Sequence, residues 1–300
     1  MWIKKGHLYK TDRYASIPYA YHIDNNLFRI FFSARNDKGQ AQPYYIDAVI
    51  DKGNIDLISD IKGPILNFGE LGTFDDSGIM PSCVVKNDDK VFMYYIGWNP
   101  QVSVSYRLSI GLAISEDGGD TFYKYNDGPL LDRSLVEPYF NTAPFVIKED
   151  IWKMWYVSCT GWITHDSKTE PLYKVKYATS TDGINWNKPN ITCIDYTPEL
   201  EAIGRPCVIN NDGYEMYFSY RKSKDYRLNK NNSYKLATAK SLNGFDYFDY
   251  NLNLLELSDN DWDSNMMEYC HTFKHNNILY MLYNGNDFGK NGFGYAIKQK

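Results

Sequence analysis

An aromatic and apolar stretch recurs five times along the chain at a nearly constant spacing. Taking Ile30, Met93, Met154, Met216 and Met281 as equivalent positions gives steps of 63, 61, 62 and 65 residues. The copies read RIFFSAR (29–35), VFMYYIG (91–97), WKMWYVS (152–158), YEMYFSY (214–220) and LYMLYNG (279–285). Aromatic-rich runs of this length are typical of β-strands, and a fixed period indicates a repeat architecture.

Each copy contains more than this one strand. A proline ends a short segment ten to twelve residues before four of the aromatic strands, and Cys270 or His271 takes the fifth place. These marker prolines are Pro18, Pro81, Pro144 and Pro206. Apolar stretches follow both the proline and the aromatic strand, so each copy is predicted to be a four-stranded antiparallel meander, except that the chain ends near the third strand of the last copy.

Three turns repeat a Ser-x-Asp/Asn-Gly pattern that ends in an aromatic residue. They are SEDGGDTF (115–122), STDGINW (180–186) and SLNGFDYF (241–248). Asp and Asn side chains bond the backbone two residues on, and Gly supplies a positive φ, so the pattern predicts tight structural hairpins.

These features predict an all-β fold, a five-bladed β-propeller of four-stranded antiparallel blades that residues 1–300 form as a single domain. A four-stranded sheet cannot bury both of its faces alone, and radial stacking of such sheets leaves only short protected edges. A β-sandwich would not require the constant period.

Composition narrows the function classes. The net charge of -5 argues against nucleic acid or an anionic membrane as the main partner, because both are bound through excess Lys and Arg. The sequence has no secretory or membrane-spanning apolar run, so a cytoplasmic protein is expected. The five cysteines form no CxxC pair, and we expect neither a metal site nor a cofactor. No oligomeric state is indicated.

The repeat resembles the five-bladed propellers of glycoside hydrolase families 43, 32, 68 and 130. The resemblance implies acidic residues on the innermost strands and an Asp beside the first proline, whereas this chain reads Tyr14-Ala15-Ser16-Ile17-Pro18. The chain also resembles propeller proteins of bacterial surface-polysaccharide gene clusters. That resemblance is carried by FSARND (32–37), FDDSGIMPS (74–82), GRP (204–206), DWDSNM (261–266) and YNGND (283–287).

Four carboxylates are candidates for catalysis. Counting back five residues from the marker prolines gives Asp76 and Glu201, and aligning DDS (75–77) with WDS (262–264) adds Asp263. Glu268 is the fourth candidate. Matching positions on inner strands of a propeller converge on its axis, and glycoside hydrolysis needs two carboxylates. The alternative is that these acids hold turns where strands begin.

Arginine, tryptophan and histidine residues are candidates for substrate binding. Arginine offers a planar fork that suits carboxylate or phosphate, or it ties neighbouring blades. Tryptophan stacks on sugar rings or packs in a core. The predicted substrate-binding residues are Arg35, Arg205, Arg221, Trp98, Trp162 and His271.

The leading hypothesis is a carbohydrate-active enzyme that cleaves or transfers a glycosidic bond of a small or activated sugar, with anionic sugars included. One alternative is a non-catalytic protein of polysaccharide biosynthesis that binds a glycan or nucleotide sugar. A sugar phosphorylase is the other. Two carboxylates facing one pocket would favour hydrolysis, whereas one carboxylate with several arginines would favour binding or transfer.

Overall fold

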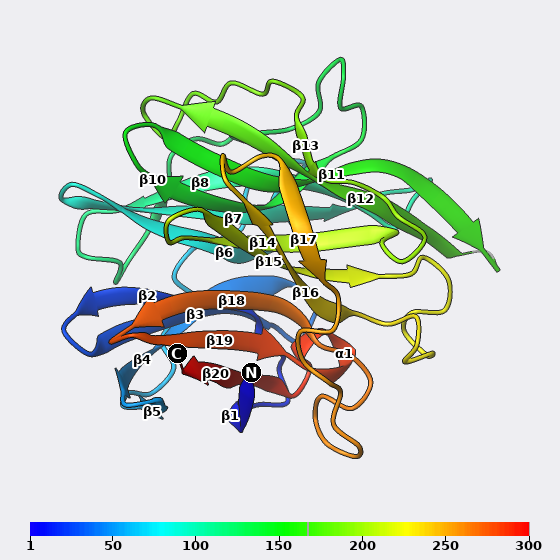
Figure 1. The fold of residues 1–300 in the computed structure, drawn as a ribbon. Coiled ribbons are helices and arrows are strands. Elements are labelled where there is room, and N and C mark those ends of the chain that lie inside the picture. The colour runs from blue at the N-terminus through cyan, green and yellow to red at the C-terminus, as the bar shows by residue number, and fades with distance from the viewer. Residues whose placement is uncertain (167, 300) are drawn as a thin grey trace.

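The computed structural model describes residues 1–166 and 168–299 and shows an all-β protein (Figure 1). The strands of the first two repeats are β2 (Ser16–Asp24), β3 (Leu27–Arg35), β4 (Ala41–Asp51), β5 (Asn54–Leu57), β6 (Gly78–Asn87), β7 (Lys90–Pro100), β8 (Tyr106–Ser115) and β9 (Tyr123–Lys124). The next two repeats contain β10 (Asn141–Lys148), β11 (Trp152–His165), β12 (Lys168–Ser180), β13 (Thr192–Ile194), β14 (Ala202–Asn210), β15 (Tyr214–Arg221), β16 (Lys235–Ser241) and β17 (Tyr247–Asn251). The last repeat contains β18 (Glu268–His275), β19 (Ile278–Asn284) and β20 (Gly292–Gln299), and β1 (Ile3–Lys10) precedes them all.

Each repeat pairs its strands antiparallel in sequence order, as the pattern predicted. The sheets run β2-β3-β4-β5, β6-β7-β8-β9 and, in the last repeat, β18-β19-β20-β1. The third and fourth repeats are joined into one larger sheet by a single parallel pair, Tyr173 with Ala202. Because β1 supplies the outermost strand of the last sheet, the two ends of the chain lie close together (Figure 1).

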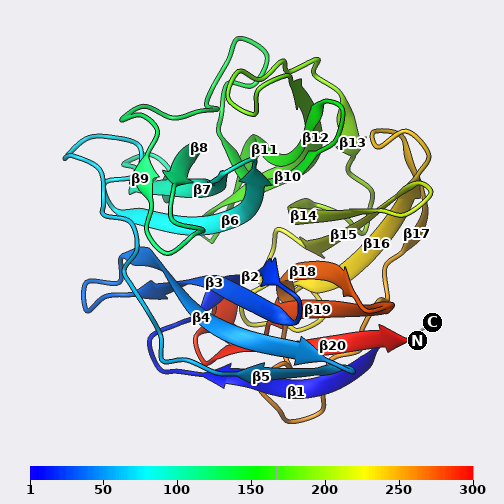
Figure 2. The ribbon, with the colours of Figure 1, turned by 90° about the vertical axis from the view of Figure 1, so that its left-hand side faces the viewer.

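The first strands of the repeats form a ring. Strand β2 contacts β6, β6 contacts β10, β10 contacts β14, β14 contacts β18, and β18 returns to β2. Figure 2 shows the sheets arranged around these inner strands. Side chains at matching positions of the five inner strands therefore lie near one common axis.

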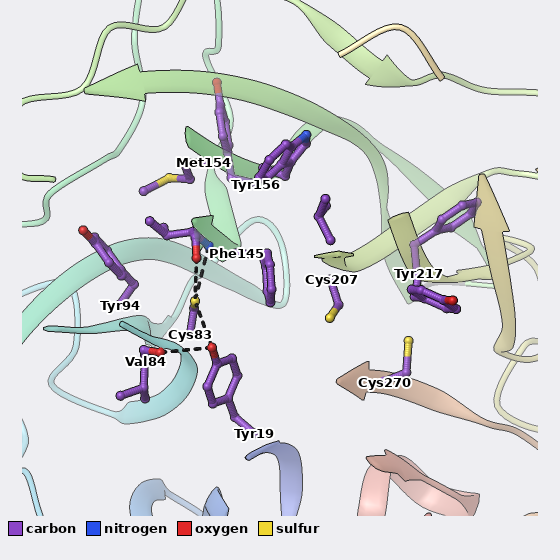
Figure 3. Close-up of a cluster of buried hydrophobic side chains, with 14 of the residues drawn as sticks. Tyr19, Cys83, Val84, Tyr94, Phe145, Met154, Tyr156, Cys207, Tyr217 and Cys270 are labelled. Atoms are coloured by element: carbon purple, nitrogen blue, oxygen red, sulfur yellow. Dashed lines mark hydrogen bonds between the residues drawn. The ribbon is translucent and has the colours of Figure 1, made fainter. Parts of the chain in front are cut away.

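The aromatic strands pack between the sheets and form most of the core. Tyr94, Trp155, Tyr156 and Tyr217 are fully buried there. Figure 3 shows Tyr19 reaching toward Cys83 and Val84, and the Tyr19 hydroxyl donates to the Val84 carbonyl at 3.0 Å. All five cysteines are buried free thiols.

The repeated Ser-x-Asp/Asn-Gly turns are structural. Asp182 Oδ1 accepts the backbone N–H groups of Ile184 and Asn185 at 2.8 and 2.7 Å, and Ser180 Oγ accepts that of Gly183 at 2.9 Å. The turns at 115–121 and 241–246 contain the same kinds of bond. These hairpins connect the third and fourth strands of their repeats, and their residues do not line the pocket on the axis.

Candidate ligand site

A pocket of about 240 Å³ lies at the end of the axis where the inner strands begin. Every inner strand contributes to it. The second strands β3, β7, β11 and β15, the third strands β8 and β12, and loop residues complete its wall. The inner strands supply Ser16, Ile17, Met80, Thr142, Ala143, Gly204, Arg205 and Tyr269. Because the starts of all five inner strands meet here, we call this hollow the axial pocket.

Each inner strand contains a β-bulge at its marker residue. The pairing register shifts between Ser16 and Tyr19, and again at the matching place in the other four repeats. Ile17 and Arg205, which precede prolines, have φ values of 60° and 44°. Such left-handed backbone is unfavourable for residues with a branched or bulky side chain, and strained backbone of this kind concentrates at functional sites. The bulges turn the strand ends that line the pocket.

Arg35 enters the pocket from the end of β3. Its side chain is exposed, and its guanidinium lies 3.9 Å above the ring of Tyr14. Within residues 1–166 and 168–299, the guanidinium has neither a hydrogen bond nor an ion pair. A stacked and unpaired arginine of this kind is free to bind an anion.

Arg205 and Arg221 are buried arginines in the same pocket. Arg205 donates to the carbonyl oxygens of Tyr269 and, at 3.0 Å, Pro18, so it ties three inner strands together. Burial lowers the pKa of Arg205 to about 10. Arg221 donates to the Tyr234 hydroxyl at 3.2 Å and lies 3.8 Å from the ring centroid of Tyr226. The three arginines predicted from the sequence therefore share one pocket.

A fourth arginine was not among the predicted residues. Arg227 lies in the loop between β15 and β16, and its side chain is 44% exposed. It contacts the rings of Tyr226 and Phe288 at 4.6 and 5.1 Å, and Glu170 Oε1 accepts a hydrogen bond from it at 3.3 Å. Two aromatic faces and one carboxylate therefore orient Arg227.

Phe288 belongs to the short segment α1 (Asn286–Gly289). Asp287 and Phe288 both have left-handed backbone there, with φ values of 58° and 61°. Ser16 Oγ donates to the carbonyl oxygen of Phe288 at 2.5 Å, which fixes this turn to β2. The turn holds the Phe288 ring against the pocket.

Aromatic side chains form much of the remaining wall. Trp98 lines the pocket as predicted, beside Tyr106, at a ring centroid distance of 6.4 Å. Trp162 is not among the lining residues of the described chain, because it packs behind them against Tyr106 and Phe140 at 5.6 and 5.9 Å. Thr142 Oγ1 is buried and has no partner among residues 1–166 and 168–299.

The structure corrects the expected positions of Asp76 and Glu201. Asp76 accepts hydrogen bonds from the Gly72 N–H at 2.9 Å and the Ser77 hydroxyl at 2.8 Å, so it holds the turn before β6. Glu201 accepts the Ser223 N–H at 2.7 Å and pairs with Lys222 at 3.6 Å. These bonds lower the pKa of Glu201 against the opposing effect of burial. Neither residue lines the axial pocket.

Asp263 belongs to a structural motif that three repeats share. Its Oδ2 accepts from the Tyr283 hydroxyl at 3.0 Å and lies 2.7 Å from Lys4 Nζ. In the second repeat, Asp75 accepts from the Tyr95 hydroxyl at 2.9 Å and pairs with Lys124 at 2.7 Å. In the third repeat, the corresponding residues are Glu137, Tyr156 and Lys188.

The other two repeats have Phe32 and Phe218 where the motif has tyrosine, and neither ring can donate a hydrogen bond. The three repeats that have the tyrosine all bond it to a buried acid, which also pairs with a lysine. These contacts make Asp75, Glu137 and Asp263 structural ties within their repeats.

Glu268 has a different environment from the other acids. It is fully buried, and neither carboxyl oxygen has a partner among the residues that the structure describes. Burial raises the pKa of Glu268 well above its usual range, and the charge of Asp287 adds to the shift. Glu268 directly precedes Tyr269, which lines the pocket. In the strand register, Glu268 lies opposite Asn284 in the same way that the pocket residue Gly204 lies opposite Ser219 in the fourth repeat.

His271 does not line the axial pocket, unlike the predicted arginines. Its Nδ1 accepts the Ala20 N–H at 2.9 Å, and its ring stacks on Tyr19 at 3.9 Å. Burial and the nearby Arg205 lower the pKa of His271 well below its usual range. The histidine therefore remains neutral and faces the far end of the inner strands.

Neither a metal centre nor a membrane span is found within residues 1–166 and 168–299. No three His, Cys, Asp or Glu side chains come together there as a set of metal ligands. In the same part of the chain, no helix has the length and apolar character needed to cross a membrane.

Comparison with known proteins gives two matches along nearly the whole sequence. The chain is 33% identical over 297 residues to the uncharacterized protein MT1551 of Mycobacterium tuberculosis, covering 97% of this chain and 95% of that protein. It is 32% identical over 297 residues to the uncharacterized protein Rv1502 of the same species, with the same coverage. This chain belongs to their family. No protein-family model matches it.

Solved structures show where the same fold occurs. One is a glycoside hydrolase with a TM-score of 0.76 and 16% identity, covering 99% of this chain and 91% of the other. A complex of BT0996 with RGII has a TM-score of 0.75, 16% identity and the same coverage. A thermostable family-43 glycoside hydrolase has a TM-score of 0.65 and 14% identity, covering 95% and 88%. The chain thus has the fold of propeller-like glycoside hydrolases.

Proposed function

We propose that the axial pocket binds a single sugar unit that carries an anionic group, either a phosphate or a carboxylate. One observation supports this proposal above all. Four arginines line the pocket, and the lining residues of the described chain include no Asp or Glu. Such a site attracts anions, and its guanidinium groups match the geometry of phosphate and carboxylate.

The aromatic wall and the size of the pocket support a sugar as the rest of the ligand. Trp98, Tyr106 and Tyr269 offer ring faces on which the apolar face of a sugar can stack. The volume of about 240 Å³ lies below the ~300–1,000 Å³ of common small-molecule pockets. One ring fits better than an oligosaccharide. The glycoside hydrolases that share the fold favour a sugar by analogy.

The position of the site follows from a further proposal, that the five four-stranded repeats are the blades of a five-bladed propeller. The ring of contacts among β2, β6, β10, β14 and β18 supports this arrangement. Pairing of β1 with β20 would close the circle by completing the last blade. The axial pocket then lies at one mouth of the central channel.

Hydrolysis by two carboxylates is not the chemistry that this pocket favours. Both geometries of that mechanism place two carboxyl groups within about 5–10 Å of each other across the scissile bond. Asp76 and Glu201 are held in turns outside the pocket, and Asp263 is buried in its tie to Tyr283 and Lys4.

A second candidate function is transfer of the sugar to inorganic phosphate, favoured by the single unpartnered acid Glu268. In this scheme, phosphate held by the arginines attacks the anomeric carbon of a glycoside. The proton of the neutral Glu268 carboxyl passes to the departing glycosidic oxygen. The products are a sugar 1-phosphate and an alcohol, and Glu268 is left as a carboxylate. Glu268 is fully buried and does not line the axial pocket, so this scheme requires a rearrangement that brings its carboxyl group to the ligand.

Ligand screening by thermal shift tests the binding proposal. We expect hexose phosphates and hexuronates to raise the melting temperature, since a ligand of the folded state stabilises it, and the matching neutral hexoses to have little effect. The shift that hexuronates produce should disappear in the Arg35→Ala/Arg227→Ala variant. Stabilisation by neutral sugars alone would contradict the proposal.

Phosphorolysis has a separate test. Incubation with glycosides and inorganic phosphate should release sugar 1-phosphate from the native protein and none from the Glu268→Gln variant, while ligand binding persists. Release of free sugar without phosphate would identify hydrolysis instead.

A further inference from the structure

A second hollow lies at the opposite end of the same inner strands. Its volume is about 930 Å³. On each inner strand, the residues that line this hollow come after the marker residue in the sequence, whereas most of those that line the axial pocket come before it. All five inner strands contribute to this lining, through Ala20, Val84, Val146, Val208 and Thr272. We call this hollow the far-side bowl.

Packed side chains separate the far-side bowl from the axial pocket. Arg205 spans the axis through its bonds to the carbonyl oxygens of Pro18 and Ser82 at 3.0 and 3.4 Å. Beyond it, the Tyr19 hydroxyl bonds the Val84 carbonyl, and the buried Cys83 thiol lies 3.7 Å from that hydroxyl (Figure 3). A ligand in the bowl would therefore be distinct from one in the pocket.

The rim of the bowl is basic. Its basic lining residues are Lys86, Lys148, Lys274, His22 and His275. Within the described residues, the lining includes no Asp or Glu. Lys148 pairs with Asp88 at 3.4 Å. Lys86 and Lys274 are exposed and have no ion-pair partner in residues 1–166 and 168–299. Two cations are thus available to a ligand.

The floor of the bowl contains buried donors that lack acceptors. His271 accepts the Ala20 N–H through Nδ1, so the neutral ring has its proton on Nε2, for which the described residues provide no acceptor. Thr272 Oγ1 is buried and also without a partner in that part of the chain. Both residues line the bowl and are at least nine-tenths buried. The buried Thr272 hydroxyl is unfavourable without a partner unless a ligand or water satisfies it. His271 Nε2 offers a second donor to a ligand in the bowl.

We propose that the far-side bowl is a second binding site, specific for a phosphate group. Phosphate combines a charge of about −1.5 to −2 with several strong acceptor oxygens. The ammonium groups of Lys86 and Lys274 supply the charge, and the floor supplies neutral donors. The phosphate can be the inorganic ion or part of a sugar phosphate, and the two sources share this chemistry.

Calorimetric titration of the whole protein with inorganic phosphate and with a hexose 1-phosphate tests the site. The Arg35→Ala/Arg227→Ala variant removes the two exposed arginines of the axial pocket, and phosphate should still bind to it. In the Lys86→Ala/Lys274→Ala variant, that binding should weaken about 10-fold or more. The matched variant Lys52→Ala/Lys230→Ala removes the same charge elsewhere and should bind like the native protein.

A substitution that leaves the net charge unchanged tests whether the donors of the floor contribute to phosphate affinity, apart from the attraction of the lysine charges. Thr272→Val keeps the shape of the side chain and removes only its hydroxyl, so we expect a several-fold weaker phosphate affinity with an intact fold. Equal weakening by both lysine pairs would overturn the proposal, because it would mean attraction to overall charge. Loss of all phosphate binding in the Arg35→Ala/Arg227→Ala variant would also overturn it, as would no binding to the native protein. Tighter binding of the hexose ester in the bowl would identify a sugar phosphate as the ligand.

Discussion

The guanidinium carbon of Arg35 lies 3.9 Å from the centroid of the Tyr14 ring. This stacking holds an exposed arginine at the edge of the axial pocket without using its hydrogen-bond donors. Its five N–H groups therefore remain available to a ligand. The relationship explains how an arginine can be fixed in place and still unpaired.

Replacing Arg35 by alanine should impair binding and leave stability nearly unchanged. A charged hydrogen bond contributes about 1.5–3 kcal/mol, so the affinity for an anionic sugar should fall about 10- to 100-fold. The exposed Arg35 guanidinium has no hydrogen bond or ion pair within the described residues to lose. Titration calorimetry and thermal melting measure the two effects. Arg133→Ala, an exposed arginine outside the pocket lining, is the control and should alter neither quantity.

Removing Lys4 should destabilise the protein through Asp263. The Lys4–Asp263 pair joins β1 to the last repeat at 2.7 Å, and Asp263 is 1% exposed. Lys4→Met leaves that buried carboxylate without its cation, and breaking a buried pair costs about 3–5 kcal/mol. Urea denaturation gives the free energy of unfolding. A double variant with Asp263→Asn should recover part of the loss, and an unchanged unfolding midpoint in Lys4→Met would refute the tie.

Asp76→Asn and Glu201→Gln should leave ligand affinity unchanged. Both acids are engaged in turns and lie outside the pocket lining. We expect each substitution to cost about 1 kcal/mol of stability, as for an ordinary hydrogen bond. Calorimetry with the anionic sugar measures the affinity, and a 10-fold loss in either variant would place these acids back at the site.

Glu268→Gln should stabilise the protein increasingly as the pH rises. Burial, followed by the charge of Asp287, raises the pKa of Glu268 above its usual value near 4.5. The folded protein therefore retains a proton that the unfolded chain has lost, and its stability falls as the pH rises from 4.5 toward the folded pKa. Glutamine resembles the protonated acid and avoids this penalty.

Unfolding free energies of the native protein and Glu268→Gln, measured from about pH 4 to about pH 8, test this sign. The two curves should meet at the acidic end and separate above it. A variant less stable than the native protein at neutral pH would mean that Glu268 is ionised and stabilised by a partner.

The sequence predicted the repeated strands well because their pattern is local. The aromatic strands at 29–35, 91–97, 152–158, 214–220 and 279–285 coincide with β3, β7, β11, β15 and β19. Arg35, Arg205, Arg221 and Trp98 were binding candidates from the sequence, and they line one pocket. Arg35 and Arg221 end second strands, Arg205 directly precedes a marker proline, and Trp98 lies two residues before the end of β7.

The carboxylates could not be placed by counting residues, because every inner strand has a bulge at its marker. A bulge adds a residue to one strand and turns the side chains that precede it. One signal was present, since Tyr95, Tyr156 and Tyr283 accompany buried acids whereas Phe32 and Phe218 do not. Arg227 lies in the loop 222–234, which is longer than the corresponding loops 36–40 and 101–105, so the repeat could not indicate it.

Titration of the native protein with a hexose 1-phosphate and with the same hexose lacking phosphate tests the central claim most directly. The claim is that the arginines of the axial pocket select an anionic sugar. We predict that the phosphate ester binds at least about 10-fold more tightly than the free hexose. Adding Arg35→Ala to the Lys86→Ala/Lys274→Ala variant, which lacks the lysines of the far-side bowl, should remove most of the difference. Equal affinities, or tighter binding of the neutral sugar, would contradict the account.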